Sequence, residues 1–289
     1  MGGSALISIP FDPEIHLGPL SLAWHGIFTA VGIFLGVTIS IRLLRGRVSE
    51  DAAYSVAFWG VVGGIIGARL VHVADRWDYY SQNLLMIPAV WSGGIAVWGA
   101  AVGGVLGGLI VALRRIDVPI GGAADAAAAG IGLGFGVGRL GDIINGEHHA
   151  VTCDGGPGVC VEFTDPNTLG QSPSFPAGDF RHADGPVHLV VLYDMLWDLA
   201  GVALVLLLRR TALGRAPEGR IFWIWAFWYG LGRFTLGFLR IGDPYPIDHL
   251  RQDQLFAIGA MVLALPVLAL IQSGVAARTF AFLRRGSPA

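Results

Sequence analysis

The chain has 289 residues, of which 54% are hydrophobic and only 14% are charged, and its formal net charge is −2. An ordinary soluble domain carries about 25% charged residues. The composition therefore argues against a soluble globular protein, and the small net charge excludes a strongly basic surface that would attract nucleic acid.

All 19 basic residues are arginine. This bias has two interpretations: a codon composition that disfavours lysine, or a functional choice, because arginine binds phosphate through two parallel hydrogen bonds. The 43 glycines lie largely within apolar runs, which suits close packing of helices in lipid.

The N-terminal segment 1–19 lacks the basic start of a secretory signal peptide and contains Asp12, Pro13 and Glu14. We therefore expect no cleaved signal peptide. The first apolar run should remain in the protein as a membrane span.

Membrane spans need about 20 mostly apolar residues. The sequence predicts an all-α, polytopic membrane protein, with residues 1–289 forming one transmembrane domain and residues 146–186 an extracytoplasmic loop or small head region. The predicted spans are Leu20–Leu44, Ala52–Val73, Gly93–Leu113, Ile120–Leu140, Val187–Leu208, Ile221–Leu239 and Gln254–Ile271.

Arginine positions predict the orientation of these spans. Twelve of the 19 arginines follow spans 1, 3, 5 and 7, which all end on the same side. Since positive charge accumulates on the cytoplasmic side, we expect the N-terminus outside and the C-terminus inside.

Glycines recur every fourth residue in spans 2, 3 and 4, which places each set on one helix face. Such ladders predict close contact between helix backbones and no chemistry. The ladders are Gly60 and Gly64; Gly99, Gly103 and Gly107; and Gly130, Gly134 and Gly138.

Four arginines lie near the outer ends of spans 2, 4 and 6: Arg69, Arg139, Arg233 and Arg240. An arginine inside a span usually faces the bundle interior or a water-filled cavity. At a common depth, the four would form a cationic cleft for an anionic lipid headgroup. The alternative is that each side chain extends to the interface and does nothing more.

Histidines and aspartates occur in the same spans. His25, His72 and His188 lie near outer span ends, where each is either functional or a hydrogen-bonded interfacial residue. Asp125, near the cytoplasmic end of span 4, is predicted to be structural. Asp194, like Asp198, lies within span 5 and is predicted to pair with an arginine.

The densest polar cluster closes span 4, at residues 138–149. It combines Arg139, Asp142, Asn145 and Glu147 with glycines that let the backbone approach a ligand. A metal site formed by Glu147 with the two histidines that follow it is an alternative. Adjacent histidines on a regular element point apart, so we expect no metal and no other cofactor.

The two cysteines, Cys153 and Cys160, both lie in the long polar loop. They are either a disulfide, if the loop faces an oxidising compartment, or two free thiols. Their distance in sequence from the arginine-rich span ends predicts that they are dispensable for chemistry.

The cluster at the end of span 4 resembles the signature of the prolipoprotein diacylglyceryl transferases, approximately Gly-Arg-x-Gly-Asn-Phe-x-Asn-x-Glu-x-x-Gly. The matching residues are Gly138, Arg139, Gly141, Asn145 and Glu147. Other segments resemble the family in the same order over nearly the whole chain: Trp24-His25-Gly26, Gly67-Ala68-Arg69, Trp91 to Gly99, His188 to Asp194, and Arg233-Phe234 with Arg240 and Asp243.

Some residues depart from the family pattern. They are His25 for Tyr, Trp98 for Tyr or His, Asp142 for Asn, Ile143 for Phe, Ala150 for Gly and Gly237 for Glu.

The resemblance implies transfer of the diacylglyceryl group of phosphatidylglycerol to the lipobox cysteine thiol of a prolipoprotein, forming a thioether and releasing glycerol phosphate. The attacking sulfur must become a thiolate, and the departing phosphate needs fixed positive charge. The residues expected to act in catalysis are Arg139 and Arg233 on the phosphate, Glu147 as an orienting group, and His25, or secondly His188, as the base. Those expected to bind substrate are Arg69, Gly141, Asp142, Asn145 and Arg240.

The resemblance also implies a multi-pass protein of the bacterial cell (inner) membrane whose partners are phosphatidylglycerol, other membrane lipids and prolipoprotein signal peptides, and not nucleic acid. Two alternatives remain at this point. One is a related transferase with another acceptor, and the other is a non-catalytic lipid-binding or transport protein of the same fold.

Overall fold

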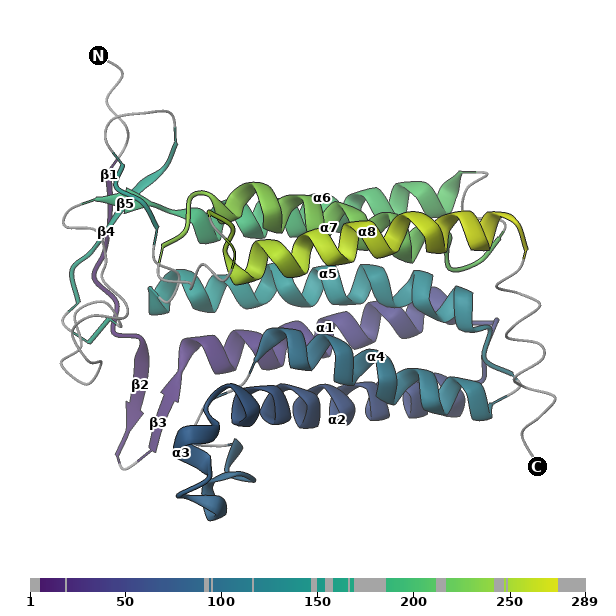
Figure 1. Ribbon diagram of the computed structural model, residues 1–289, viewed down its shortest axis with the longest axis horizontal. Coiled ribbons are helices and arrows are strands. Elements are labelled where there is room, and N and C mark those ends of the chain that lie inside the picture. Colours follow the sequence, from purple (N-terminus) through teal and green to yellow (C-terminus); the bar gives the residue numbers. More distant parts are fainter. Residues whose placement is uncertain are drawn as a thin grey trace. The chain divides into compact units, whose positions relative to one another are not determined.

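The computed structural model describes residues 6–18, 20–90, 94, 96–115, 117–146, 150–153, 158–165, 167–168, 186–211, 217–241, 247 and 249–274. Within them the chain is mostly helical, with short strands near the helix ends (Figure 1). The helices are α1 (Trp24–Leu44), α2 (Glu50–Asp75), α3 (Trp77–Tyr80), the 3₁₀ helix η1 (Leu84–Met86), α4 (Val97–Arg114), α5 (Ile120–Asn145), α6 (Val190–Arg210), α7 (Arg220–Gly237) and α8 (Gln252–Gln272). The strands are β1 (Leu6–Ile9), β2 (Glu14–Leu17), β3 (Leu20–Ala23), β4 (Cys160–Phe163) and β5 (Val187–His188).

Five of the predicted spans correspond to helices that are long and apolar enough to cross a membrane: α1, α2, α5, α6 and α8. The other two predicted spans are helical as α4 and α7, and α4 includes a shorter apolar stretch, Gly99–Arg114. The described chain is thus consistent with a polytopic membrane protein. The total of seven spans and the orientation of the termini stay predictions.

The strands correct the all-α prediction at two span ends. Leu20–Ala23, predicted to begin span 1, forms β3 and pairs antiparallel with β2. Val187 and His188, predicted to begin span 5, form β5. Both segments are short and apolar, so length alone could not separate strand from helix.

By internal contacts the chain divides into two compact units, residues 1–40 with 125–273, and residues 41–124 with 274–289. In the second unit α2 packs on α4 through glycines. A methyl group at Gly103 would lie 2.9 Å from the Gly67 Cα atom, which no side chain tolerates. The predicted glycine ladder of α4 is therefore a helix contact.

In the first unit α5 packs between α1 and α6 (Figure 1). Gly130 contacts the backbone of α1 at Gly36, whereas Gly136 faces Leu199 of α6. Because α5 has small residues on opposite faces, it approaches both neighbours closely, and the polar residues at its last turns lie between them.

A three-stranded sheet in the first unit has the order β1-β4-β5, with β1 parallel and β5 antiparallel to β4. It brings the predicted loop 146–186 back onto the start of α6. Its apolar core consists of Ile9, Ala150, Val161, Phe163, Val187, Leu189, Val190 and Val191.

Candidate functional site

Three arginine side chains that are far apart in sequence meet four aspartates in the first unit. Arg139 comes from α5, Arg233 from α7 and Arg240 from the turn that follows α7. The aspartates are Asp142 of α5, Asp194 and Asp198 of α6, and Asp253 of α8, all buried. Buried charges of one sign need partners of the other sign, and here the carboxylates come from three helices.

Asp194 is held by two of the arginines. Arg240 Nη2 donates a hydrogen bond to Asp194 Oδ2, and Arg233 Nη1 lies 3.7 Å from the same oxygen. The prediction that Asp194 pairs with an arginine is confirmed.

Arg139 lies nearly two turns before the end of α5, between two carboxylates. Its Nη1 donates to Asp142 Oδ2 at 2.8 Å, and its Nε lies 4.0 Å from Asp198 Oδ2. The side chain is 13% exposed. The aspartates thus hold this guanidinium in place at the end of the helix.

Arg233 makes ion pairs with Asp194 and Asp253, and only the second includes a hydrogen bond. Its Nη2 donates to Asp253 Oδ2 at 3.2 Å. The Nε and Nη1 atoms of Arg233 are buried and have no hydrogen-bond partner within the described part of the chain. Buried donors are rarely left unsatisfied in proteins, so these two point to an anionic acceptor.

His25, the second residue of α1, contacts this arginine cluster through Asp142. His25 Nδ1 is hydrogen-bonded to Asp142 Oδ1. Gly141 makes the contact possible, because a Cβ atom on it would lie 2.6 Å from the His25 Cα atom. Two predicted substrate-binding residues, Gly141 and Asp142, are therefore placed directly against the predicted base.

Asn145 is buried at the last residue of α5. Gly146 follows with a positive φ of 64°, and a side chain there would meet Thr168 and Phe163. Glu147, the predicted orienting carboxylate, lies outside the described residues, as does Asp243 of the resemblance.

Arg69 belongs to the second unit, and its guanidinium donates to three backbone carbonyls. The acceptors are Ile87 at 2.8 Å, Gly94 at 2.8 Å and Met86 at 2.6 Å. The Tyr80 ring lies 5.1 Å from its Cζ atom. These contacts fix the segment before α4, and the lipid-binding role of Arg69 stays a prediction.

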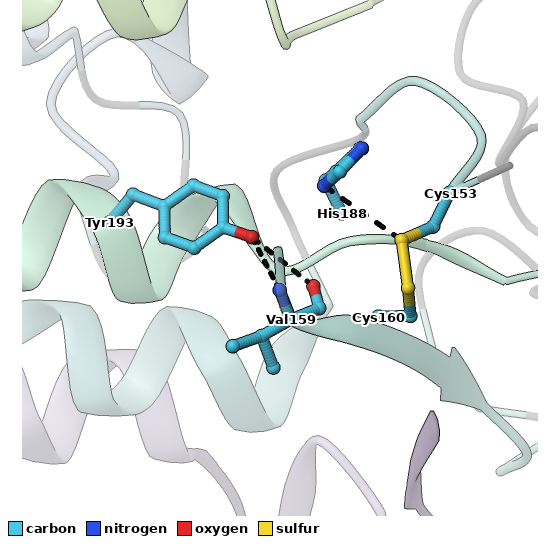
Figure 2. The surroundings of a disulfide bond; sticks show 5 residues. All are labelled: Cys153, Val159, Cys160, His188 and Tyr193. Carbon is cyan, nitrogen blue, oxygen red and sulfur yellow. Dashed lines mark hydrogen bonds between the residues drawn. A yellow bond between two sulfur atoms is a disulfide. The ribbon is translucent and has the colours of Figure 1, made fainter. Parts of the chain in front are cut away.

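His188, the second predicted base, lies beside a disulfide (Figure 2). Cys153 and Cys160 are bonded, which decides between the two alternatives left open by the sequence. His188 Nδ1 is 3.8 Å from Cys153 Sγ, and the Tyr193 hydroxyl accepts from the Val159 backbone N–H at 2.7 Å. His188 thus contacts the disulfide at the start of β4.

Asp125 has the structural role predicted for it. Its carboxylate accepts from the backbone N–H groups of Gly219 and Phe222, both at 2.9 Å. These donors lie at the N-terminus of α7, where backbone N–H groups have no partner within the helix. Asp125 therefore caps α7 from α5.

The sequence did not indicate Asp253 or Tyr229. Tyr229, one turn before Arg233 on α7, interacts electrostatically with Arg233, Asp198 and Arg139 and packs against the Phe135 ring at 5.2 Å. Its spacing of four residues from Arg233 was the available signal. Asp253 carried no such signal, since it comes from the end of another helix.

Taken together, the buried guanidinium groups can bind an anion, and the imidazole beside them can accept a proton. Comparison with known proteins gives this chemistry a context. The sequence profile of the family described as "Prolipoprotein diacylglyceryl transferase" matches residues 14–270.

Curated relatives cover nearly the whole chain. One from Staphylococcus haemolyticus (strain JCSC1435) is 33% identical over 261 residues, which is 89% of this chain and 87% of the relative. One from Lysinibacillus sphaericus (strain C3-41) is 34% identical over 262 residues, which is 90% of this chain and 92% of the relative. One from Staphylococcus carnosus (strain TM300) is 32% identical over 260 residues, 89% of each. All three are named phosphatidylglycerol--prolipoprotein diacylglyceryl transferase, and this chain belongs to the prolipoprotein diacylglyceryl transferase family.

Proposed function

We propose that this chain is a transferase that moves the diacylglyceryl group of phosphatidylglycerol to the lipobox cysteine thiol of prolipoproteins. The observation that carries the proposal is the relationship over about 90% of the chain to enzymes with that name. The site has the two groups that the reaction requires, arginine side chains for a phosphate and a proton acceptor beside them.

The reaction joins sulfur to carbon and releases a phosphate ester. The thiolate attacks the glyceryl carbon that carries the phosphate, a carbon–sulfur bond forms, and the carbon–oxygen bond to phosphate breaks. The electron pair of that bond leaves on glycerol phosphate, and the thiol proton passes to a base. The negative charge that develops on the phosphate oxygen is what the site must stabilise.

Arg233 and Arg139 bind the phosphate in this proposal. The two donors of Arg233 that lack an acceptor, Nε and Nη1, are each available to a phosphate oxygen. Arg240 supports them through Asp194, which it shares with Arg233. Asn145, at the end of α5, and Glu147 orient the headgroup.

His25 is the base that accepts the thiol proton, and His188 is the second candidate. His25 is favoured because Asp142 joins it to Arg139, whereas His188 contacts the disulfide. A histidine titrates near pH 6.5 when unperturbed, which suits proton transfer at neutral pH. Gly141 and Asp142 contribute by positioning His25.

The setting proposed for this reaction is the bacterial cell (inner) membrane, with seven spans, the N-terminus outside and the cytoplasmic ends marked by arginine. The substrates are then phosphatidylglycerol from the surrounding lipid and the lipobox segment of a prolipoprotein. The β1-β4-β5 sheet and its disulfide lie on the extracytoplasmic side, where oxidation is favoured.

The test is incubation of the purified protein with phosphatidylglycerol vesicles and a lipobox peptide, read by mass spectrometry. The expected result is a peptide heavier by one diacylglyceryl group, together with free glycerol phosphate. A peptide with serine in place of cysteine is the matched control and should not react. Consumption of lipid without peptide modification would indicate another acceptor, and lipid binding without turnover would indicate a non-catalytic protein.

A further inference from the structure

Asp142 is shared by two functional side chains. Its Oδ1 is bonded to His25 Nδ1, and its Oδ2 accepts from Arg139 Nη1 at 2.8 Å. The Asp142 side chain is 4% exposed, whereas that of His25 is 35% exposed. One buried carboxylate therefore joins a partly accessible imidazole to an arginine of the proposed phosphate site.

A carboxylate at Nδ1 determines which tautomer an imidazole adopts. With the proton on Nδ1 donated to Asp142, the lone pair lies on Nε2, and Nε2 becomes the basic nitrogen. The same carboxylate stabilises the imidazolium that forms when Nε2 accepts a proton. This pairing is the one that orients a general base beside a nucleophile in many hydrolases.

The backbone fixes the position of this pair. α1 follows directly on β3, with His25 as its second residue, and the Trp24 N–H donates to the Pro13 carbonyl at 3.1 Å. The start of α1 is therefore tied to the β2–β3 hairpin. On the other side, Gly141 allows α5 to touch the backbone of His25. Arg139 holds the second oxygen of Asp142 and so restricts rotation of the carboxylate.

We propose that Asp142 is a positioning residue that fixes His25 as the base for the acceptor thiol, so that a cysteine–histidine–aspartate arrangement is completed by the cysteine of the substrate. The inference rests on the proposed function. The proton passes from the thiol to His25 Nε2, the sulfur attacks the glyceryl carbon, and the phosphate ester leaves with the electrons of the broken carbon–oxygen bond.

The test uses two acceptor peptides that are identical except for cysteine or selenocysteine. A free thiol has a pKa of about 8.5 and needs a base at neutral pH, whereas a selenol is far more acidic and is already ionised. With the cysteine peptide, Asp142→Asn and His25→Gln should each lower kcat by about 10²- to 10⁴-fold, the usual contribution of general base catalysis. With the selenocysteine peptide, both variants should come within about tenfold of the unmodified protein.

Asp253→Asn is the matched control, since it removes a buried carboxylate from Arg233 and leaves His25 untouched. Its loss of rate should be the same with both peptides. His25→Gln keeps the Asp142–Arg139 ion pair, so it remains informative if Asp142→Asn does not fold.

Failure of the proposed function and failure of this inference give different results in the experiment. If the unmodified protein transfers no lipid to the cysteine peptide, the proposed function is wrong. If it does so but selenocysteine restores neither variant, Asp142 and His25 have no part in activating the thiol, and this inference is overturned.

Discussion

Replacement of Arg233 by lysine tests the phosphate site most directly. The guanidinium of Arg233 uses Nη2 for Asp253 at 3.2 Å, while Nε and Nη1 are buried without a hydrogen-bond partner in the described residues. Lysine keeps the positive charge that balances Asp253 and Asp194, but it has a single ammonium group. This group can bind the carboxylate or the phosphate, but it lacks the separate N–H groups with which a guanidinium binds both at once.

The magnitude follows from the donors that are lost. A hydrogen bond to a charged group contributes about 1.5 to 3 kcal/mol. Since about 1.36 kcal/mol corresponds to a tenfold change in rate, the loss of one such bond to the phosphate lowers kcat/KM by roughly 10- to 150-fold. The loss of both would square this factor. The effect should fall on kcat if the bonds strengthen as the phosphate leaves.

The measurement is kcat/KM for a lipobox peptide with Arg233→Lys in phosphatidylglycerol vesicles. Arg220→Lys is the control, because Arg220 begins the same helix, donates from Nη1 to Gln272 Oε1 at 3.2 Å, and lies about 20 Å from Arg233 along the helix at 1.5 Å per residue. Arg220→Lys should leave the rate unchanged. An Arg233→Lys variant that folds and retains the full rate would refute the assignment of its unsatisfied donors to phosphate.

Other variants test the rest of the site. Arg139→Ala should lose nearly all transfer activity, and wild-type turnover in that variant would exclude Arg139 from phosphate binding. A Cys153→Ser, Cys160→Ser double variant should unfold more easily, by about 2 to 3 kcal/mol for so short a loop, yet keep its transfer rate when folded; an inserted but inactive protein would show that the disulfide matters for chemistry. A reporter fused after Ala289 should be active only in the cytoplasm, and activity outside would reverse the predicted orientation.

The helices could be predicted from sequence because their signal is local. Runs of about 20 apolar residues are determined by the thickness of the bilayer, and each predicted span coincides with a helix to within about five residues at either end. The strands were missed because β3 and β5 are short apolar segments that continue directly into α1 and α6. β5 pairs with β4 of the long loop, which no local pattern records, whereas β3 pairs with β2 immediately before it, in a hairpin with Gly18 at positive φ.

The site could be predicted in part for a related reason. An arginine or aspartate within an apolar run is expensive, so Arg139, Arg233 and Asp194 stood out, and the prediction that Asp194 pairs with arginine is confirmed. Which carboxylate pairs with which arginine depends on how the helices pack. Asp253 was therefore missed, and Arg69, which looked equivalent to the others, bonds backbone carbonyls in the second unit instead.

Two departures from the family pattern, His25 for Tyr and Asp142 for Asn, lie in contact. Changed singly, each leaves a mismatch: His25→Tyr leaves Asp142 without its imidazole, and Asp142→Asn leaves His25 without its carboxylate. If the contact is energetically coupled, the double variant His25→Tyr, Asp142→Asn should retain more activity than the product of the two single losses predicts. Coupling between residues in contact is about 0.5 to 3 kcal/mol, which corresponds to a twofold to 150-fold excess in kcat/KM. Strictly multiplicative losses would mean that the two substitutions act independently, and that the bond between them contributes nothing to catalysis.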